Sequence, residues 1–435
     1  MSSTQSNPVH VAGQPVPGGP GEGMSRRGFL ATSAAAAGSA TLLAGTGRLA
    51  GATVRPQGQR LVVVFLRGGA DGMSVVAPVA DPNYSLLRPN IGVRTASALP
   101  LDGVAADRRF AFHPAARRLA GLYRAGKVAV VPAAGLPIRT RSHFDAQAAM
   151  EDGSFAARDV QRGWVGRWVS GTALAGDSPL RAVAIGDGPP ASFRGATCMS
   201  ATSLRSLSLL SWGPPREHVA AHAERLYAGQ GVHPLLAAAV APTLTTLTSL
   251  SGVGDGAPPA GWPTSEAGVG LWPVARLIEM GMPVEVAHVD GGHWDQHNDM
   301  GAPDDPAGQM SKAVAGLDAA IGSFFDRIGP EADRTTMVVM TEFGRRAGEN
   351  SSGGTDHGTA AAMFVIGGGV QPGVKGTWPG LAAAELVEGD LRTTVDYRQV
   401  LAEVVSRRMG ADSMMLDAVF PRLRTSPADW VGVCT

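Results

Sequence analysis

Side chains that can bind a metal ion recur in short, glycine-rich segments of this 435-residue chain. The candidate ligands are Asp71, Asp295, His297, Glu342, Asp356 and His357. Four carboxylates and two imidazoles without a thiolate suit Zn²⁺ or Mn²⁺, and a carboxylate-rich half of such a set could hold Mg²⁺ or Ca²⁺. We therefore expect one or two divalent cations, which would relieve the repulsion between neighbouring carboxylates.

A second polar cluster, RTRSHFD, covers residues 139–145 and offers a hydroxyl between basic side chains. Ser142 could act as a nucleophile while Arg141 attracts an anionic substrate. Ser142 could also be the N-cap of a helix through Ala146–Glu151. An N-cap serine can present an anion to free backbone N–H groups, so the two roles are compatible.

Six short apolar runs predict the strands that must position these residues. They are Arg60–Leu66, Lys127–Pro132, Arg181–Ile185, Pro283–Val289, Thr335–Thr341 and Ala361–Ile366. Their apolarity is nearly continuous and does not alternate, which is typical of strands buried on both faces.

Helical patterns lie between these strands, and the alternation predicts an α/β fold with a doubly wound, mostly parallel sheet. The predicted helices are His113–Ala125, Pro215–Tyr227, Pro234–Leu247, Val274–Gly281, Pro306–Ile328 and Asp396–Met409. Pro242 should kink or split the third of them. A loop is predicted over Val253–Ser265, but neither flank resembles a separate domain. We expect residues 53–435 to form one domain with insertions.

The candidate ligands follow the first, fourth and fifth predicted strands, at the edge where ligands bind in such sheets. Between the fifth and sixth strands there is no crossover helix, so these two should be antiparallel neighbours. That return brings Asp356 and His357 to the edge that already holds Glu342. Each segment alone also fits a solvated loop or a turn capped by an aspartate. Convergence on one edge is what favours a metal site.

The N-terminal region predicts export. SRRGFL, residues 25–30, precedes a weakly apolar stretch without acidic residues, which is typical of a twin-arginine signal. Ala50-Gly51-Ala52 is a candidate cleavage site, so residues 1–52 would comprise a disordered N-terminus and the signal peptide. The apolar stretch is too short for a membrane span. We expect the twin-arginine translocase as a partner and a location in the periplasm, at the cell surface or outside the cell.

Charge and cysteine usage exclude other classes. Lys+Arg and Asp+Glu both number 37, and no basic run stands out, which disfavours nucleic acid as a partner. Cys198 and Cys434 are the only cysteines, so a cysteine-rich metal site is excluded. The two could form a disulfide in an oxidising compartment or remain free thiols.

Several segments together resemble an uncharacterised bacterial family, domain of unknown function 1501. They are RLVVVFLRGGADGMSVVAP, GLPIRTRSHFDAQAAME, WDQH, MTEFGRRAGENSSGGTDHG and TTVDYRQVLAEV. The resemblance runs from about Arg60 to about Met409, and the export signal is typical of the family as well. The family is grouped with alkaline phosphatases, sulfatases and phosphoglycerate mutases, which implies their metal-dependent α/β fold.

The resemblance also implies residue roles. Asp71 resembles the first metal-binding acid of that superfamily, and Ser142 its nucleophile, with Thr140 a weaker counterpart. Asp295 and His297 resemble its Asp/His pair.

At the later strand Glu342-Phe343 stands where relatives carry Asp-His, so one histidine ligand is absent there. His357 resembles the final histidine, with Asp356 beside it.

Two functions follow as expectations. The first is an exported metal-dependent hydrolase that acts on a small anionic ester of phosphate or sulfate. The alternative is a non-catalytic exported metal-binding protein of the same fold, with a role in binding or surface assembly. The missing histidine at Phe343 motivates the alternative, because it leaves open how many metals bind and whether hydrolysis is retained.

Overall fold

The computed structural model describes residues 58–155, 162–174, 177–204, 221–222, 225–226, 234–250, 256–424 and 426–435. The predicted signal segment, residues 1–52, and most of the helix predicted over Pro215–Tyr227 lie outside the described residues. Among the described residues, no helix has both the length and the apolarity needed to cross a membrane.

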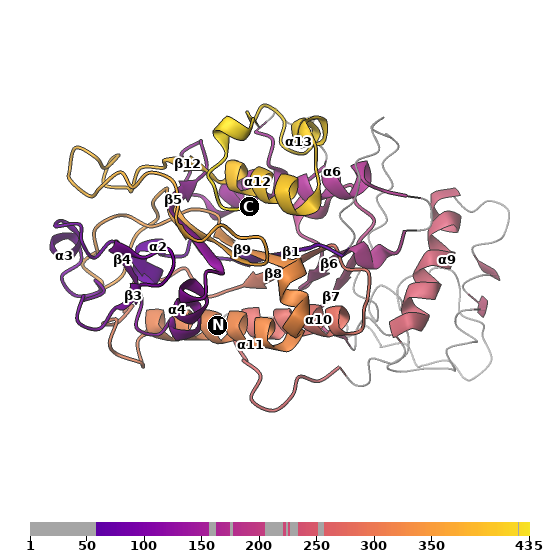
Figure 1. The fold of residues 1–435 in the computed structure, drawn as a ribbon, viewed down its shortest axis with the longest axis horizontal. Helices are drawn as coiled ribbons and strands as arrows, with labels where there is room; N and C mark the ends of the chain where they lie inside the picture. The colour runs from indigo at the N-terminus through magenta and orange to yellow at the C-terminus, as the bar shows by residue number, and fades with distance from the viewer. Residues whose placement is uncertain are drawn as a thin grey trace, which may run out of the picture.

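A large sheet forms the centre of the molecule (Figure 1). Its strands are β1 (Arg60–Leu66), β5 (Val128–Gly135), β6 (Ala182–Ile185), β7 (Met199–Ala201), β8 (Val286–Gly291), β9 (Thr335–Thr341), β10 (Ala361–Gly367), β11 (Gly373–Val374) and β12 (Val395–Asp396). They are ordered β11-β5-β10-β9-β1-β8-β6-β7, and β12 pairs with β5. All six predicted strands are present, and β1 and β9 have the predicted bounds.

The strand directions confirm the predicted mostly parallel sheet with one antiparallel strand. β1 is parallel to both β8 and β9, whereas β10 is antiparallel to both β9 and β5. In this register Leu66 pairs with Gly291 on one side and with Thr341 on the other. The carboxyl ends of β1, β8 and β9 therefore lie level at one edge of the sheet.

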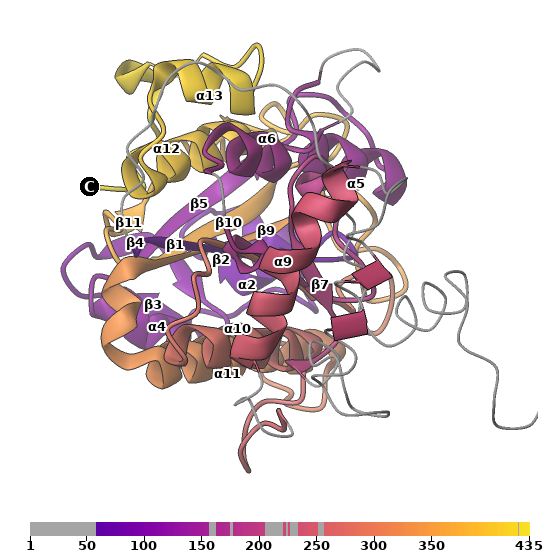
Figure 2. The same ribbon diagram turned by 90° about the vertical axis from the view of Figure 1, so that its right-hand side faces the viewer.

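Helices cover both faces of the sheet, as Figures 1 and 2 show. One face packs against α4 (Arg117–Arg124), α10 (Glu266–Glu279) and α11 (Gln309–Ile328). The other packs against α5 (His143–Asp152), α6 (Trp164–Gly171), α12 (Tyr397–Met409) and α13 (Ser413–Val419). Alternate residues of β1 enter the two cores, Val62 and Val64 on one side and Leu61 and Val63 on the other. This two-sided burial explains the continuous apolarity of the strand sequences.

The remaining elements depart in part from the sequence analysis. A small antiparallel sheet of β2 (Val76–Ala77), β3 (Leu99–Leu101) and β4 (Asp107–Phe112), with helices α2 (Gly72–Val75) and α3 (Tyr84–Leu87), was not predicted. Helix α9 (Pro234–Ser249) contains Pro242, and the proline does not split it. Short 3-10 helices cover Pro179–Arg181, Ala191–Phe193, Gly329–Arg334 and Pro427–Asp429.

Helix α10 begins at Glu266, eight residues before the predicted start at Val274. The side chain of Ser265 caps it by accepting a hydrogen bond from the N–H of Gly268 at 3.3 Å. Pro273 lies inside the helix without interrupting it, and the cap marks where the helix begins.

Gly344 provides a test of the close contact between the loop after β9 and the start of β10. A Cβ at this position would lie 1.7 Å from the carbonyl oxygen of Ala360, so the backbone would have to shift. We expect Gly344→Ala to lower the free energy of unfolding by about 1–3 kcal/mol. Gly121→Ala is the matched control, because a Cβ in that α4 position meets nothing within 4 Å. Urea unfolding midpoints would measure the stability of both variants. Equal midpoints would contradict the close contact between Gly344 and the backbone of Ala360.

Candidate metal centre

The loops that follow β1, β8 and β9 meet at the level edge of the sheet, together with the N-terminus of α5 and the segment before β10. Three side chains there bring one ligand atom each to within 4.8 Å of one another: His143, Asp295 and His357. Nε2 of His143 lies 3.1 Å from Nε2 of His357 and 3.4 Å from Oδ2 of Asp295. Nε2 of His357 lies 3.1 Å from Oδ1 of Asp295.

These spacings, with the two histidines near different oxygens of Asp295, are close to those between neighbouring ligands of a tetrahedral metal site. With metal–ligand bonds of about 2.0–2.1 Å, neighbouring ligand atoms in a tetrahedron are about 3.3 Å apart. Two imidazole nitrogens and a carboxylate oxygen are ligands that Zn²⁺ and Mn²⁺ accept. The donor set therefore fits the divalent cation that the sequence predicted.

Both histidines are held in the tautomer that a metal requires. The backbone carbonyl of Arg141 can only accept, so Nδ1 of His357, 2.9 Å away, carries the proton. Nδ1 of His143 likewise donates to Oε1 of Glu342 at 2.8 Å. Each Nε2 then presents a lone pair to the other, which is unfavourable without a cation between them.

His143 is the histidine that sequence analysis missed. It begins α5, directly after the N-cap residue Ser142, and so approaches the edge from a helix and not from a strand end. Sequence analysis singled out the segment that contains His143, but it did so because of the hydroxyl of Ser142. His143 thus brings a histidine to the cluster from a position about two hundred residues before Phe343.

Glu342 lies behind His143 and orients it. Its carboxylate is fully buried, and Oε1 accepts from the N–H of Gly68 at 2.9 Å and from Nε2 of Gln147 at 2.9 Å, as well as from His143. Burial would raise the pKa of Glu342, but the hydrogen bonds from Gln147 and His143 outweigh it and lower the pKa. A carboxylate that holds the far nitrogen of a ligating histidine is a common support of metal sites.

His297 and Asp356 extend the cluster. Nε2 of His297 lies 2.9 Å from both Nε2 of His357 and Oδ1 of Asp295, which places it as a further potential ligand. Nδ1 of His297 lies 3.7 Å from Oδ1 of Asp356, and that carboxylate also accepts from Asn350 at 3.0 Å. The hydrogen bond from Asn350 is the main cause that lowers the pKa of Asp356. Asp356 thus supports His297 from behind.

Arg345 places a permanent cation beside the cluster. Its buried guanidinium donates to Oδ1 of Asp295 at 2.6 Å and lies 3.4 Å from Nε2 of His297. Burial would raise the pKa of Asp295, but the hydrogen bond from Arg345 is the main cause that lowers it, to about 2. Asp295 is therefore ionised at any pH at which the protein works.

Glu342 and Asp356, predicted as direct ligands, stand behind histidines, and Asp71 lies outside the cluster altogether. Its Oδ2 forms a buried ion pair of 2.5 Å with Nη1 of Arg88 and accepts from the hydroxyl of Ser74. Arg88 in turn donates to the backbone carbonyls of Arg346 and Ala347. Asp71 therefore links the loop after β1 to the segment beyond Gly344, and its partner Arg88 carries no sequence signal that could have shown this.

The two predicted catalytic residues have structural partners. The hydroxyl of Ser142 accepts from the N–H of Asp145 at 3.4 Å, as the N-cap alternative predicted. Nη2 of Arg141 forms an ion pair with the buried carboxylate of Asp390 at 2.8 Å. The backbone carbonyl of Arg141 orients His357, so the backbone of Arg141 supports the centre independently of the ion pair of its side chain.

Fold and site together define an α/β protein with a mostly parallel sheet and an imidazole–carboxylate cluster at the carboxyl ends of its strands. The chain belongs to the family described as "Protein of unknown function (DUF1501)", whose model matches residues 125–420. This confirms the resemblance that the sequence motifs indicated. No curated protein matches the chain.

Several solved structures are similar to the chain. One is a protein in the alkaline phosphatase superfamily from Vibrio parahaemolyticus, with 12% identity, 94% of this chain and 81% of that chain covered, and a TM-score of 0.36. Another is the lipoteichoic acid synthase of Listeria monocytogenes, with 10% identity, coverages of 73% and 67%, and a TM-score of 0.28. A third is alkaline phosphatase from the Antarctic bacterium TAB5, with 12% identity, coverages of 72% and 93%, and a TM-score of 0.27.

Metal titration would separate the residues that serve the centre from those that serve the fold. Because Glu342 fixes the orientation of His143, we expect Glu342→Gln to weaken Zn²⁺ binding by about 10–100-fold. Asp71→Asn should leave the Zn²⁺ affinity unchanged but lower the free energy of unfolding by about 3–5 kcal/mol, since it leaves Arg88 buried without its partner. Competition with a chromogenic chelator and urea unfolding are the measurements. A Zn²⁺ affinity that depends on Asp71 would assign it to the centre.

The pair of Asp295 and Arg345 predicts a pH dependence of stability in the metal-free protein. The pKa of Asp295 is about 2 in the folded chain, below its ordinary value, so the stabilisation by its ionised form is complete above about pH 4. It is lost as the pH falls toward 2. The difference in unfolding free energy between the wild type and Asp295→Asn should therefore be constant from about pH 7 to 5 and shrink by pH 3. Urea unfolding at these values tests this, and a difference that grows on acidification would have the wrong sign.

Proposed function

We propose that this protein is an exported metal-dependent hydrolase that acts on phosphate or sulfate esters. The observation that carries the proposal is that two histidine Nε2 atoms face each other at 3.1 Å, each as a lone pair in the tautomers set by Glu342 and Arg141. They lie 3.4 Å (His143) and 3.1 Å (His357) from the two oxygens of Asp295. A purely structural pair of histidines would donate to an acceptor and would not face another lone pair. Zn²⁺ or Mn²⁺ suits this donor set best.

A bound metal ion would polarise the ester and generate a nucleophilic hydroxide from water at neutral pH. The surrounding residues orient the candidate ligands for that chemistry. Glu342 retains the proton of His143 at Nδ1, and the carbonyl of Arg141 retains that of His357. Arg345 keeps Asp295 ionised, so the ligand set stays charged over the working pH range.

A positive surface next to His357 supports an anionic substrate. The side chains of Arg139, Arg141 and Arg346 gather around the buried carboxylate of Asp390, at 3.9, 2.8 and 3.8 Å. Each of the three guanidinium groups is partly exposed, and Glu388 neutralises only Arg139 by an ion pair. Three cations against two carboxylates leave a positive excess that would attract a phosphate or sulfate group.

The second candidate function is a non-catalytic metal-binding protein. It is favoured by the partners of the catalytic candidates, because the hydroxyl of Ser142 is used as an N-cap and Arg141 is paired with Asp390. On this alternative the metal stabilises the fold or binds a ligand, and no ester is turned over. A hydrolase that uses a metal-activated water does not need Ser142. A substitution of Ser142 therefore also distinguishes attack by the serine hydroxyl from attack by water.

Turnover of 4-nitrophenyl phosphate and 4-nitrophenyl sulfate by the mature, Zn²⁺- or Mn²⁺-loaded protein tests the proposal. We expect turnover that a chelator abolishes and that Asp295→Ala reduces at least about 100-fold, because the mutation removes a ligand and frees the charge of Arg345. Asp299→Asn is the matched control, an exposed acid on the same loop.

The outcome with Ser142→Ala distinguishes the mechanisms. Loss of turnover assigns Ser142 as the nucleophile, whereas retained turnover assigns attack to water. A metal-loaded protein that shows higher thermal stability but no turnover across an ester panel would reject the hydrolase and leave the non-catalytic function.

A further inference from the structure

His297 is a candidate ligand whose support comes from a different part of the chain. It lies in the loop after β8, and its Nε2 is 2.9 Å from Nε2 of His357 and from Oδ1 of Asp295. Its Nδ1 is 3.7 Å from Oδ1 of Asp356, which is longer than an ordinary hydrogen bond. That contact alone holds the imidazole loosely, so the place of His297 depends on how the loop itself is fixed.

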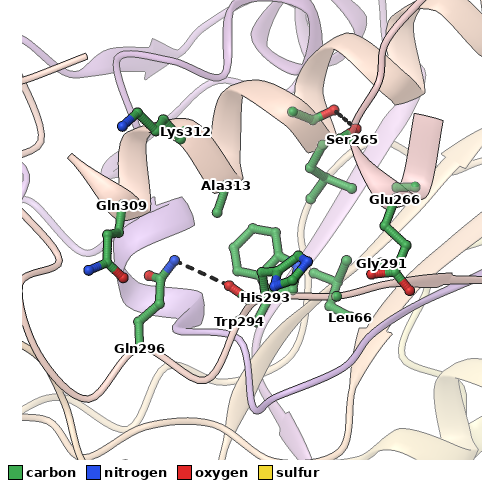
Figure 3. A pocket seen from close by; sticks show the side chains of 14 residues that line it. Leu66, Ser265, Glu266, Gly291, His293, Trp294, Gln296, Gln309, Lys312 and Ala313 are labelled. Carbon is green, nitrogen blue, oxygen red and sulfur yellow. Dashed lines mark hydrogen bonds between the residues drawn. The ribbon is translucent and has the colours of Figure 1, made fainter. Parts of the chain in front are cut away.

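One side of this loop borders a cavity. Trp294 and Gln296 line a space of about 340 Å³ between the loop, α10 and α11 (Figure 3). The side-chain amide of Gln296 donates to the carbonyl of His293 in the same loop, and its Oε1 has no hydrogen-bond partner in the described part of the chain. The amide of Gln296 thus binds its own loop and does not anchor it to a neighbouring element.

A turn over residues 350–354 lies against His297 and the residues that follow it. The N–H groups of Asp299 and Met300 donate to two carbonyls of this turn, at 3.0 and 2.9 Å. A Cβ on Gly354 would lie 2.3 Å from the carbonyl carbon of His297 and 2.4 Å from its oxygen. Only a glycine therefore lets the turn approach the backbone of His297 this closely.

The side-chain amide of Asn350 joins this turn to the metal cluster. Its Oδ1 accepts from the N–H groups of Ser352 and Gly354, both at 3.0 Å, which closes the turn. Its Nδ2 donates to the carbonyl of His297 at 2.9 Å and to Oδ1 of Asp356 at 3.0 Å. An amide has two donor hydrogens and an oxygen with two lone pairs, so all four positions are used.

Two routes lead from Asn350 to His297. One hydrogen bond holds the main-chain carbonyl of His297, and the other holds the carboxylate of Asp356, which faces Nδ1 of His297. A carboxylate beside the far nitrogen of a histidine keeps the proton there and leaves Nε2 free to bind a metal. Asn350 therefore acts on both the place and the orientation of the imidazole.

We propose that Asn350 is a positioning residue that holds His297 in the metal centre, so that Nε2 of His297 becomes a ligand of the bound ion. The proposal rests on the metal centre of the proposed function but not on hydrolysis. The connection between β9 and β10 then provides one ligand, His357, and the support of another.

Asn350→Asp separates the two halves of the amide. The aspartate keeps the oxygen that closes the turn, but its second oxygen cannot donate to the carbonyl of His297 or to Asp356. We expect Zn²⁺ binding about 10–100-fold weaker, measured by competition with a chromogenic chelator. The visible absorption spectrum of the Co²⁺-loaded protein should also change, because it reports the ligands and their geometry. A residue that only stabilises the fold would leave that spectrum unchanged.

Ser352→Asp is the matched control. It adds the same charge at an exposed position of the same turn, and it should bind Zn²⁺ as the wild type does.

A double-mutant cycle tests whether the effect passes through His297. His297→Ala alone should weaken Zn²⁺ binding, and adding Asn350→Asp to it should cause no further loss. An equal loss with and without His297 would overturn the proposal, and so would wild-type affinity with an unchanged Co²⁺ spectrum in Asn350→Asp.

Gly354→Ala is the second variant if Asn350→Asp does not fold. Its Cβ would displace the same carbonyl of His297, so Zn²⁺ binding should again weaken, and wild-type affinity would count against the proposal. Both readouts are taken without an ester. A lack of turnover would therefore reject the hydrolase and leave this result standing, whereas wild-type metal binding by these variants would reject the positioning role alone.

Discussion

The buried guanidinium of Arg345 holds the edge of the sheet together. It donates to the backbone carbonyls of Gly68, Gly69, Trp294 and Thr355, and to the carboxylate of Asp295. These acceptors come from the loop after β1, the loop after β8 and the segment before β10. A planar group with five donors can satisfy three loops at once, which a lysine could not do. The positions of the metal-ligand candidates therefore follow from where this one side chain is anchored.

The same group also sets the electrostatics of the centre. A buried guanidinium is costly unless a carboxylate compensates it, and Asp295 is the carboxylate that does so. Asp295 is shared between Arg345 and the histidines, so its charge is partly neutralised before any metal arrives. Glu342 and Asp356 lie behind histidines, where they orient imidazoles. The centre is thus built from a small inner set of nitrogens and one carboxylate, with the other acids in support.

Strands and the convergence of the loops could be predicted from sequence, because burial on both faces leaves continuous apolar runs and the carboxyl ends of parallel strands meet at one edge. The antiparallel return of β10 followed from the lack of a crossover helix. His143 could not be found by this reasoning, since it reaches the edge from the first turn of a helix. The position of Asp71 could not be predicted for another reason. Its partner Arg88 lies in a region of a short helix and loops that has no hydrophobic periodicity. Glu342 was predicted as a direct metal ligand. Its position behind an imidazole could not be predicted, because that depends on His143, which the sequence analysis did not select.

The antiparallel pairing of β9 with β10 has a consequence for the order in which the chain assembles. Arg345, Thr355 and His357 lie on one continuous connection between these two strands, so the bridge of Arg345 with His357 and its hydrogen bond to Thr355 close a short loop and can form early. His143 and Asp295 join from remote parts of the chain only when the whole sheet has closed. The complete set of candidate ligands is therefore assembled only in the finished fold.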